Sequence, residues 1–398
     1  MKKQLLITSR EDKIVSSLFE EKELVQVNVE DKENTSLLGN IYVGKVKNIV
    51  KNIEAAFVEI ADGQMCYLPL GKKEHPIFCN SKKNTKVCIG DEILVQVSKD
   101  AIKTKNPSVT TNLQFAGKYV ILTHGKILAG ISGKITDEDE RNRLKKIVKP
   151  YVNEEKGCGM IVRTNAEGVA DEKILSEAKV LYELYASIST TGIHKNCFTK
   201  LYQAPAGFLC DIRDGYDEEL DQIITDDLRL YEEIKQYLST YQKEDLDKLS
   251  FYEDEMVSLN CLYGLETKLE KALQKKVWLK SGGYLVIEPT EALTVIDVNS
   301  GKAIAGKKST DMHFLKINLE AAKEITKQLR LRNLSGIILV DFIDMESKQS
   351  KQQLIQQLES DLKKDPVKAV YVDMTKLNLV EITRKKVRKP LHEQIRSV

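Results

Sequence analysis

The chain has 398 residues, of which 42% are hydrophobic and 30% charged, and its formal net charge is +2. This length supports large hydrophobic cores and predicts two to four domains. The near-neutral balance excludes a uniformly basic surface, so any nucleic-acid-binding surface must be a local patch. The sequence has neither a long apolar run nor a signal peptide, so we expect a soluble, cytoplasmic protein with no membrane association.

Seven cysteines are scattered along the sequence and form no C-x-x-C pair. In a cytoplasmic chain, cysteines of this kind are mostly small buried hydrophobic residues. We therefore expect neither a zinc site nor disulfides.

The N-terminal part of the chain predicts β-structure. Residues 1–30 contain two strand-like runs, QLLITS and ELVQVNVE, which are too few for a domain and must pair with later strands. From Asn40 on, short alternating strands separated by Gly, Asn and Asp turns predict a small β-barrel. Phe57 and Tyr67 lie on successive strands of this barrel. Exposed aromatic residues among lysines such as Lys105 suit the stacking of single-stranded bases, although an aromatic residue of a barrel is as often part of its core.

The middle of the chain predicts a mixed α and β region. Strands are expected at YVILTHG, KILAGISGKI and GMIVRT, and helices over residues 137–148 and 171–188. Arg163 and Thr164 end the last of these strands. An arginine fork beside a hydroxyl is suited to bind phosphate, whereas a surface arginine is the more common outcome. Further on, FLCDIRD is expected to be a strand and residues 255–276 a helix.

The stretch from Gly282 to Met345 predicts two apolar strands joined by a helix. Apolar residues recur at helical spacing over residues 312–331, and a βαβ crossover makes the two strands parallel neighbours. Asp297 and Asp341 then lie at the same carboxyl edge of the sheet, where open α/β folds place ligands. Two carboxylates this close repel each other unless a cation lies between them, and an oxygen-only set favours Mg²⁺.

The period of a β-strand selects among the polar residues. Residues two apart share a face, so Asp297 and Asn299 point the same way. Asp344 follows Asp341 by three residues and would point to the opposite face if the strand continued, so Asp341 is the expected second ligand. The alternative is that these aspartates only cap turns at strand ends.

A loop rich in glycine and lysine, residues 301–308, follows the first of these strands. It nearly matches a phosphate-binding P-loop, which leaves a nucleotide hydrolase as an alternative function, but Lys308 stands where a P-loop has Ser or Thr. Together with Lys302 and Lys307 it suits the backbone phosphates of a polymer better. The end of the chain predicts a helix over residues 352–363, the strand VKAVYVDMT and a basic helix, EITRKKVRKPLHEQI.

Several long segments closely resemble the ribonuclease E/G family: EALTVIDVNSGK, NLEAAKEITKQLRLRNLSGIILVDFIDM and NLVEITRKKVR. AAFVEI with YLPLGK, and GMIVRT, match it elsewhere in the family's order, so the resemblance covers essentially the whole chain. It implies an α+β multidomain fold, in which an RNase H-like scaffold is interrupted by an OB-fold β-barrel and a 5′-sensor region and is followed by a DNase I-like α/β catalytic subdomain. The implied bounds are 1–36 for the N-terminal strands of the RNase H-like subdomain, 37–117 for the OB-fold, 118–210 for the sensor, 211–275 for the remainder of the RNase H-like subdomain and 276–398 for the catalytic subdomain.

The resemblance also implies roles for individual residues. Asp297 and Asp341 correspond to the aspartates that bind Mg²⁺, and Asn299 supports the site by hydrogen bonding. Arg163 and Thr164 correspond to the pocket for a 5′-monophosphate.

The barrel residues Phe57, Tyr67 and Lys105 correspond to residues that grip RNA, and Tyr67 keeps the stacking face of a phenylalanine in the family. The implied function is a Mg²⁺-dependent endoribonuclease that cuts single-stranded RNA in RNA processing and mRNA decay. It prefers 5′-monophosphorylated substrates and leaves 5′-phosphate and 3′-hydroxyl ends. A nucleotide hydrolase and a non-catalytic RNA-binding protein are the alternatives. Members usually continue with a C-P-x-C zinc-link motif where this sequence ends, so we expect no zinc-linked dimer, while another homo-oligomer is compatible with the sequence.

Overall fold

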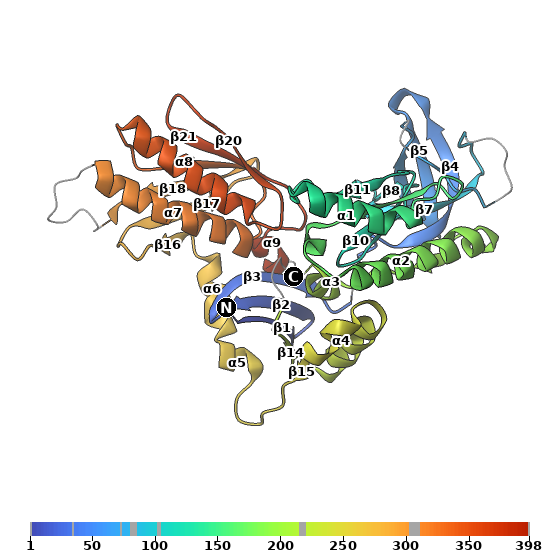
Figure 1. The fold of residues 1–398 in the computed structure, drawn as a ribbon, viewed down its shortest axis with the longest axis horizontal. Coiled ribbons are helices and arrows are strands. Elements are labelled where there is room, and N and C mark those ends of the chain that lie inside the picture. Colours follow the sequence, from blue (N-terminus) through green and yellow to red (C-terminus); the bar gives the residue numbers. More distant parts are fainter. Residues whose placement is uncertain are drawn as a thin grey trace. The chain divides into compact units, whose positions relative to one another are not determined.

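The computed structural model describes residues 2–33, 36–71, 74–79, 86–101, 105–214, 220–301 and 311–396. The chain forms two compact units, each built from separate segments (Figure 1). The first unit contains Met1–Glu33, Glu218–Lys235 and Asp247–Val398, and the second contains Asn34–Asp217 and Gln236–Leu246.

The first unit contains a five-stranded sheet that combines N-terminal strands with two strands from the middle of the chain. Its strands are β1 (Lys3–Arg10), β2 (Lys13–Glu20), β3 (Glu23–Asp31), β14 (Gln222–Thr225) and β15 (Leu249–Phe251), in the order β15-β14-β1-β2-β3. The N-terminal strands therefore pair with strands from later in the chain, as the sequence predicted, because β1 and β14 are parallel partners. The C-terminal helix α9 (Leu391–Arg396) is held against β3, where the Val29 N–H donates to the Gln394 side chain over 2.7 Å.

Two predictions for residues 208–276 are wrong. FLCDIRD is not a strand but the helix α3 (Gly207–Arg213), in which Phe208, Leu209 and Ile212 are all buried. A strand would place Phe208 and Leu209 on opposite faces, whereas a helix brings all three onto one face. The helix expected over residues 255–276 is divided into two.

The break in that expected helix falls at Gly264. Its φ of +57° is in the left-handed region that glycine adopts most easily, and there α5 (Leu259–Tyr263) ends and α6 (Leu265–Leu273) begins. The last residue of the expected helix, Lys276, instead begins the strand β16 (Lys276–Trp278). A third helix of the region, α4 (Leu228–Tyr241), follows β14.

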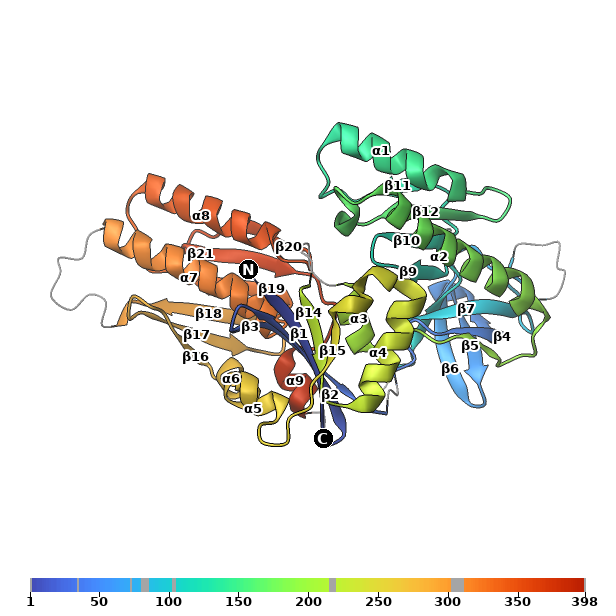
Figure 2. The ribbon, with the colours of Figure 1, turned by 60° about the horizontal axis from the view of Figure 1, so that its bottom comes forward.

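The first unit also contains a six-stranded sheet in the order β16-β17-β18-β19-β21-β20. Its further strands are β17 (Tyr284–Pro289), β18 (Leu293–Asn299), β19 (Gly336–Asp341), β20 (Ala369–Met374) and β21 (Leu379–Arg384). The helices α7 (Asp311–Leu331) and α8 (Lys348–Lys363) lie side by side over one face of this sheet (Figures 1 and 2). Apolar side chains of the strands and both helices form one core beneath them, among them Leu285, Ile296, Ile338, Ile325 and Leu358.

Helix α7 and strand β20 were predicted closely, but two other elements of this sheet were not. The first apolar run is a hairpin of two antiparallel strands, β17 and β18, and not a single strand. The first part of the expected basic helix, EITR, belongs to strand β21, which lies between β19 and β20. Val380, Ile382 and Arg384 are buried there at the alternating spacing of a strand.

The second unit contains a closed barrel of β4 (Ile41–Val50), β5 (Ala55–Ala61), β6 (Gln64–Pro69), β7 (Glu92–Lys99) and β8 (Ser108–Thr110). Strands pair in the order β4-β5-β6-β8-β7, and the pairing of β7 with β4 closes the ring. A five-stranded barrel of this kind is OB-like. A short strand, β13 (Lys200–Tyr202), adds to β4.

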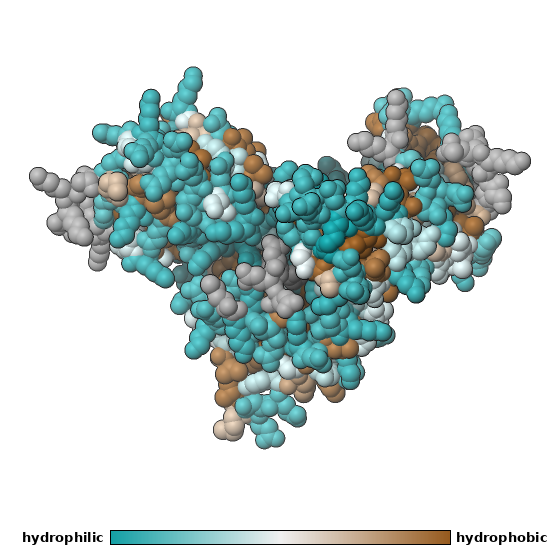
Figure 3. All heavy atoms as spheres, in the orientation of Figure 1, coloured by the Kyte–Doolittle hydropathy of each residue, from teal (hydrophilic) through white to brown (hydrophobic). Residues whose placement is uncertain are grey.

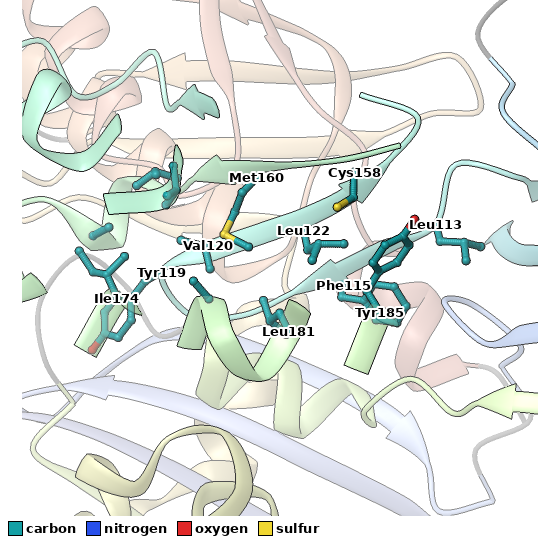
Figure 4. Close-up of a cluster of buried hydrophobic side chains, with 14 of the residues drawn as sticks. Leu113, Phe115, Tyr119, Val120, Leu122, Cys158, Met160, Ile174, Leu181 and Tyr185 are labelled. Atoms are coloured by element: carbon teal, nitrogen blue, oxygen red, sulfur yellow. The ribbon is translucent and has the colours of Figure 1, made fainter. Parts of the chain in front are cut away.

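A four-stranded sheet in the order β11-β12-β10-β9 completes the second unit. Its strands are β9 (Gln114–Ala116), β10 (Val120–His124), β11 (Ala129–Ile131) and β12 (Cys158–Val162), and the helices α1 (Glu138–Val148) and α2 (Asp171–Thr191) pack against it. Figure 4 shows Leu181 of α2 lying beneath Leu122 of β10, with Phe115 and Tyr185 stacked edge to face beside them. The strands and helices predicted here are confirmed.

The cysteines are less buried than expected. Of the seven, Cys66 and Cys158 are fully buried, while Cys88 and Cys261 are exposed and the other three are half-buried. Among the described residues, none of the helices combines the length and hydrophobicity needed to span a bilayer.

Candidate active site

Asp297 and Asp341 lie directly opposite each other on neighbouring strands. Strands β18 and β19 are parallel, helix α7 precedes β19 in the crossover between them, and the two aspartates are partners in the register. The prediction that the strands are parallel neighbours is confirmed. Both aspartates are exposed.

The pleat of β18 explains why Asp297 is exposed within a well-packed sheet. Thr294, Ile296 and Val298 are buried toward the helices, so the residues between them point to the other face. Asp297 and Asn299 therefore both project from the face of the sheet that α7 and α8 leave uncovered. We call this surface the open face.

The carboxylates on the open face influence each other. The Asn299 side chain donates a hydrogen bond of 2.6 Å to the Asp297 carboxylate. Partial desolvation of its carboxylate raises the pKa of Asp341, and the nearby carboxylates of Asp297 and Asp344 raise it further. These neighbouring carboxylates repel one another, and a divalent cation bound between them would relieve the repulsion. Their oxygen atoms are the ligands that a hard divalent cation prefers.

The strand ends at Asp341, so alternation along a strand does not decide where Asp344 points. Asp344 was expected to point to the opposite face on the premise that the strand continues, and this premise is wrong. The Asp344 carboxylate remains close enough to raise the pKa of Asp341. Its position is held by Asn378, whose side chain donates to the Asp344 carboxylate over 3.2 Å. Lys351 in turn donates to the Asn378 side chain over 3.0 Å.

A buried asparagine that sequence reasoning missed holds the segment after Asp341. The side chain of Asn318 in α7 donates to the Ile343 carbonyl over 2.8 Å and accepts from the Ile343 N–H over 3.1 Å. Asn318 is completely buried, so both polar groups of its amide are satisfied by this one backbone unit. A polar residue on the apolar face of the predicted helix was the signal in the sequence.

The loop lysines Lys302, Lys307 and Lys308 lie outside the described residues. The described start of this loop is Gly301, with a φ of +53°. A Cβ atom at this position would lie 2.5 Å from the Gly282 carbonyl oxygen, so both the backbone conformation and the space require glycine.

Arg163 and Thr164 follow β12, as expected, and both already have partners. The Arg163 guanidinium donates to the Gly117 carbonyl over 2.6 Å and forms an ion pair of 2.7 Å with Asp214. The Thr164 hydroxyl lies 2.9 Å from the Ser132 hydroxyl. A phosphate bound by Arg163 would therefore compete with the Asp214 carboxylate.

Glu177 organises the backbone beside Arg163 and was also missed. Its carboxylate accepts hydrogen bonds from the N–H groups of three successive residues, Lys118, Tyr119 and Val120, over 2.5 to 2.9 Å. Burial raises the pKa of Glu177, while these three donors oppose the shift. A Cβ atom on Gly117 would lie 2.4 Å from the Glu177 carboxyl carbon, so glycine is needed at that position.

Phe57 and Tyr67 are neighbours on the outside of the barrel. They are register partners on β5 and β6, and their ring centroids lie 6.2 Å apart in an edge-to-face arrangement. Both are half-buried, whereas Ala56 and Val58 on either side of Phe57 belong to the barrel core. Phe57 is therefore not a core residue. Lys105 is exposed and lies three residues before the strand β8, which pairs with β6 at Tyr67.

Comparison with known proteins identifies a family that the chain matches along most of its length. The ribonuclease E/G family profile matches residues 114–387. The chain is 34% identical to ribonuclease G of Escherichia coli K12 over 378 residues, covering 92% of this chain and 76% of that protein. It is 33% identical to ribonuclease G of Haemophilus influenzae over 395 residues, covering 97% and 79% of the two chains. It is 32% identical to ribonuclease E of Nostoc sp. over 409 residues, covering 99% and 57%.

The fold, the paired carboxylates and these similarities define the class as endoribonucleases that use a divalent metal ion. The chain belongs to the ribonuclease E/G family.

Proposed function

We propose that this chain is a Mg²⁺-dependent endoribonuclease that hydrolyses single-stranded RNA at the open face, with Asp297 and Asp341 holding the ion. The observation that carries the proposal is the register pairing of these two exposed carboxylates on parallel strands. Mg²⁺ is bound through one or two carboxylates and keeps several waters, which suits a pair of aspartates. When bound, the ion supplies charge stabilisation at the phosphate and an activated water.

The other residues of the site act on the carboxylates and the backbone around them. Asn299 orients the Asp297 carboxylate through its 2.6 Å hydrogen bond. Asn318 holds the backbone at Ile343 and so steadies the segment that follows Asp341. Hydrolysis at such a site, in line with the family, leaves 5′-phosphate and 3′-hydroxyl ends.

Recognition of a 5′-monophosphate is the second part of the proposal. Arg163 would exchange Asp214 for the terminal phosphate, and Thr164 would add a hydroxyl donor. The exchange replaces one anion on the guanidinium by another, so the arginine is never left without a negative partner. The hydrogen bond to the Gly117 carbonyl would hold the Arg163 side chain in place during this exchange.

The RNA strand itself would be held by the barrel, where Phe57 and Tyr67 offer stacking surfaces and Lys105 a positive charge. Lys302, Lys307 and Lys308 are proposed to neutralise phosphates near the site. In this proposal the barrel is the OB-fold. The RNase H-like subdomain, the DNase I-like subdomain and the sensor have the boundaries predicted from the sequence. The cellular role proposed is RNA processing and mRNA decay in the cytoplasm.

Cleavage of a short AU-rich single-stranded oligonucleotide, with Mg²⁺ and with a chelator, tests this proposal. We expect Mg²⁺-dependent internal cleavage, with 5′-phosphate and 3′-hydroxyl ends identified by mass spectrometry. ATP hydrolysis without RNA cleavage would instead favour the nucleotide hydrolase. RNA binding without cleavage at any Mg²⁺ concentration would favour the non-catalytic RNA-binding protein.

A further inference from the structure

The open face carries an aromatic pair, the exposed Trp278 and the half-buried Tyr284, near the carboxylates. Trp278 of β16, the single tryptophan of the chain, is 63% exposed and contacts Tyr284 of β17, with ring centroids 5.3 Å apart. We propose that Trp278 and Tyr284 form a stacking subsite for a nucleobase of the RNA strand next to the phosphate that is cleaved. The inference rests on the proposed function and assigns these residues a positioning role within it.

The sheet register places Trp278 and Tyr284 in one row with Asn299. Trp278 is the partner of Tyr284, and Tyr284 is the partner of Asn299. Since neighbouring strands lie about 4.8 Å apart, Tyr284 is one strand and Trp278 two strands, about 10 Å, from Asn299. The carboxylate of Asp297 lies two residues, about 7 Å, along β18 from Asn299, and a nucleotide adjoining the cleaved phosphate can span that offset from Tyr284.

Alternation along the strands puts both rings on the same face as the carboxylates. Val277 and Leu279 on either side of Trp278 pack toward the helix-covered core, as does Leu285 after Tyr284. The residues between them must therefore project from the open face. Asp297, which also projects from that face, is the partner of Val286, two residues after Tyr284.

The chemistry of the pair matches a nucleotide. The Lys276 ammonium lies 4.1 Å from the Trp278 ring centroid and 3.5 Å from the Tyr284 ring centroid. Aromatic faces stack on any base, and a lysine beside them meets the negative phosphate. Because Trp278 stays mostly exposed with Lys276 in place, ring surface remains for a base.

Several large apolar side chains of the described residues are exposed, and Trp278 is the bulkiest of them. The face drawn in Figure 3 is mostly hydrophilic, with separate hydrophobic patches. A large indole exposed to water forgoes the free energy of burial, and tryptophan is enriched where a partner covers it. Exposed apolar residues elsewhere on the open face, such as Val295 and Ile337, would also fit a second copy of the chain. RNA is favoured over a second copy as the occupant because the Lys276 ammonium lies over both rings and can meet a phosphate. The carboxylates on the same face are also suited to act on a phosphodiester.

The single tryptophan provides a direct test. Wild-type protein in a chelator is titrated with a short single-stranded RNA, and Trp278 emission is compared with the anisotropy of the same RNA carrying a label. We expect emission to be quenched in proportion to the RNA bound. One nucleotide at a time around the cleavage position is then made abasic, and we expect quenching to be lost when one particular base is removed.

Variants test the same contact during cleavage with Mg²⁺. Base stacking predicts that Trp278→Ala raises KM by roughly fivefold to a hundredfold, with a smaller change in kcat, and that Trp278→Phe restores most of the loss. The abasic substrate should erase the difference between wild type and Trp278→Ala, which a purely structural role would not do. Phe251→Ala, which removes a partly exposed aromatic side chain from the edge strand β15, is the matched control and should leave KM unchanged.

The outcomes separate the two proposals. RNA that binds and is cleaved normally, without quenching and without an effect of Trp278→Ala, overturns the stacking subsite alone. Base-specific quenching by bound RNA in a protein that never cleaves RNA supports the subsite and contradicts the proposed function. Trp278 emission that depends on protein concentration and not on RNA, together with a dimer in sedimentation, overturns the subsite in favour of a second copy on this face.

Discussion

Asn318, buried in α7, forms two hydrogen bonds with the backbone of Ile343, two residues beyond the candidate ligand Asp341. One amide side chain thus satisfies both the N–H and the carbonyl of a single residue in the segment after β19. A buried amide with all its partners in one place is a rigid contact, because breaking it leaves polar groups unpaired on both sides. The helix of the βαβ unit therefore holds the segment that follows Asp341 as well as connecting the two strands.

Replacing Asn318 by Leu should lower both stability and cleavage. The side chain keeps a similar size but leaves the Ile343 N–H and carbonyl without their partners, so we expect a loss of about 1–3 kcal/mol in the free energy of unfolding. Denaturant unfolding measures this loss, and kcat is expected to fall more than KM rises because the segment beside Asp341 is no longer held. Lys316→Ala, on an exposed position of the same helix, is the control. Unchanged stability and kcat in Asn318→Leu would exclude the positioning role.

Asp297→Asn and Asp341→Asn should each reduce cleavage by at least about a hundredfold while RNA binding is largely kept, because each removes one charged ligand of the proposed ion. Cleavage rates over a range of Mg²⁺ concentrations and RNA binding by anisotropy measure the two effects. Asp373→Asn, at an exposed carboxylate on β20, is the matched control.

Asp344→Asn decides between the two aspartates that follow the second apolar run. We expect a smaller loss than in Asp341→Asn, because Asp344 lies beyond the strand and is held by Asn378. An inactive Asp344 variant beside an active Asp341 variant would show that the ligand was assigned to the wrong carboxylate.

A 5′-monophosphorylated RNA should be cut faster than the same RNA with a 5′-hydroxyl or a 5′-triphosphate, and Arg163→Ala should abolish the preference. Charge-assisted hydrogen bonds to a phosphate account for roughly a tenfold to hundredfold difference. Parallel assays of the three substrates measure it, with Arg229→Ala, at an exposed arginine, as the control. Equal rates on all three substrates for the wild type would contradict the sensor, and a preference unchanged in Arg163→Ala would locate it elsewhere.

The second unit should lose stability in mild acid through His124. This histidine is buried, with its ring nitrogens 2.8 Å from the Tyr185 hydroxyl and 2.9 Å from the His75 carbonyl oxygen, and burial lowers its pKa below the ordinary 6.5. The unfolded chain therefore binds the proton more readily than the folded one. The contribution to stability is complete above about pH 6.5 and is lost progressively as the pH falls below that value.

Hydrogen exchange of strands β10 and β12 at pH 5.5 and 7.5 measures this effect. His124→Gln should have lower stability at both pH values but a smaller difference between them than the wild type. His194→Gln, at an exposed histidine, should keep the wild-type difference. An identical pH dependence in His124→Gln and in the wild type would assign the acid sensitivity to other groups.

The sequence alone determined that the two strands bearing Asp297 and Asp341 are parallel neighbours. Helical periodicity over residues 312–331 agrees with α7 (Asp311–Leu331), and the two apolar runs that flank it include the parallel strands β18 and β19. These features are local, because a period of 3.6 or 2 is written into neighbouring residues, and a short crossover between parallel strands leaves few topologies. That is why Asp297 and Asp341 could be paired before their positions were known.

Only the tertiary structure decided the contacts between segments far apart in the chain. The ion pair of Arg163 with Asp214, the hold of Asn318 on Ile343 and the row from Trp278 to Asn299 each join different elements, and no local pattern encodes such partners. Short apolar runs were also ambiguous: FLCDIRD became a helix and EITR a strand because burial against their neighbours, and not intrinsic preference, selected the conformation.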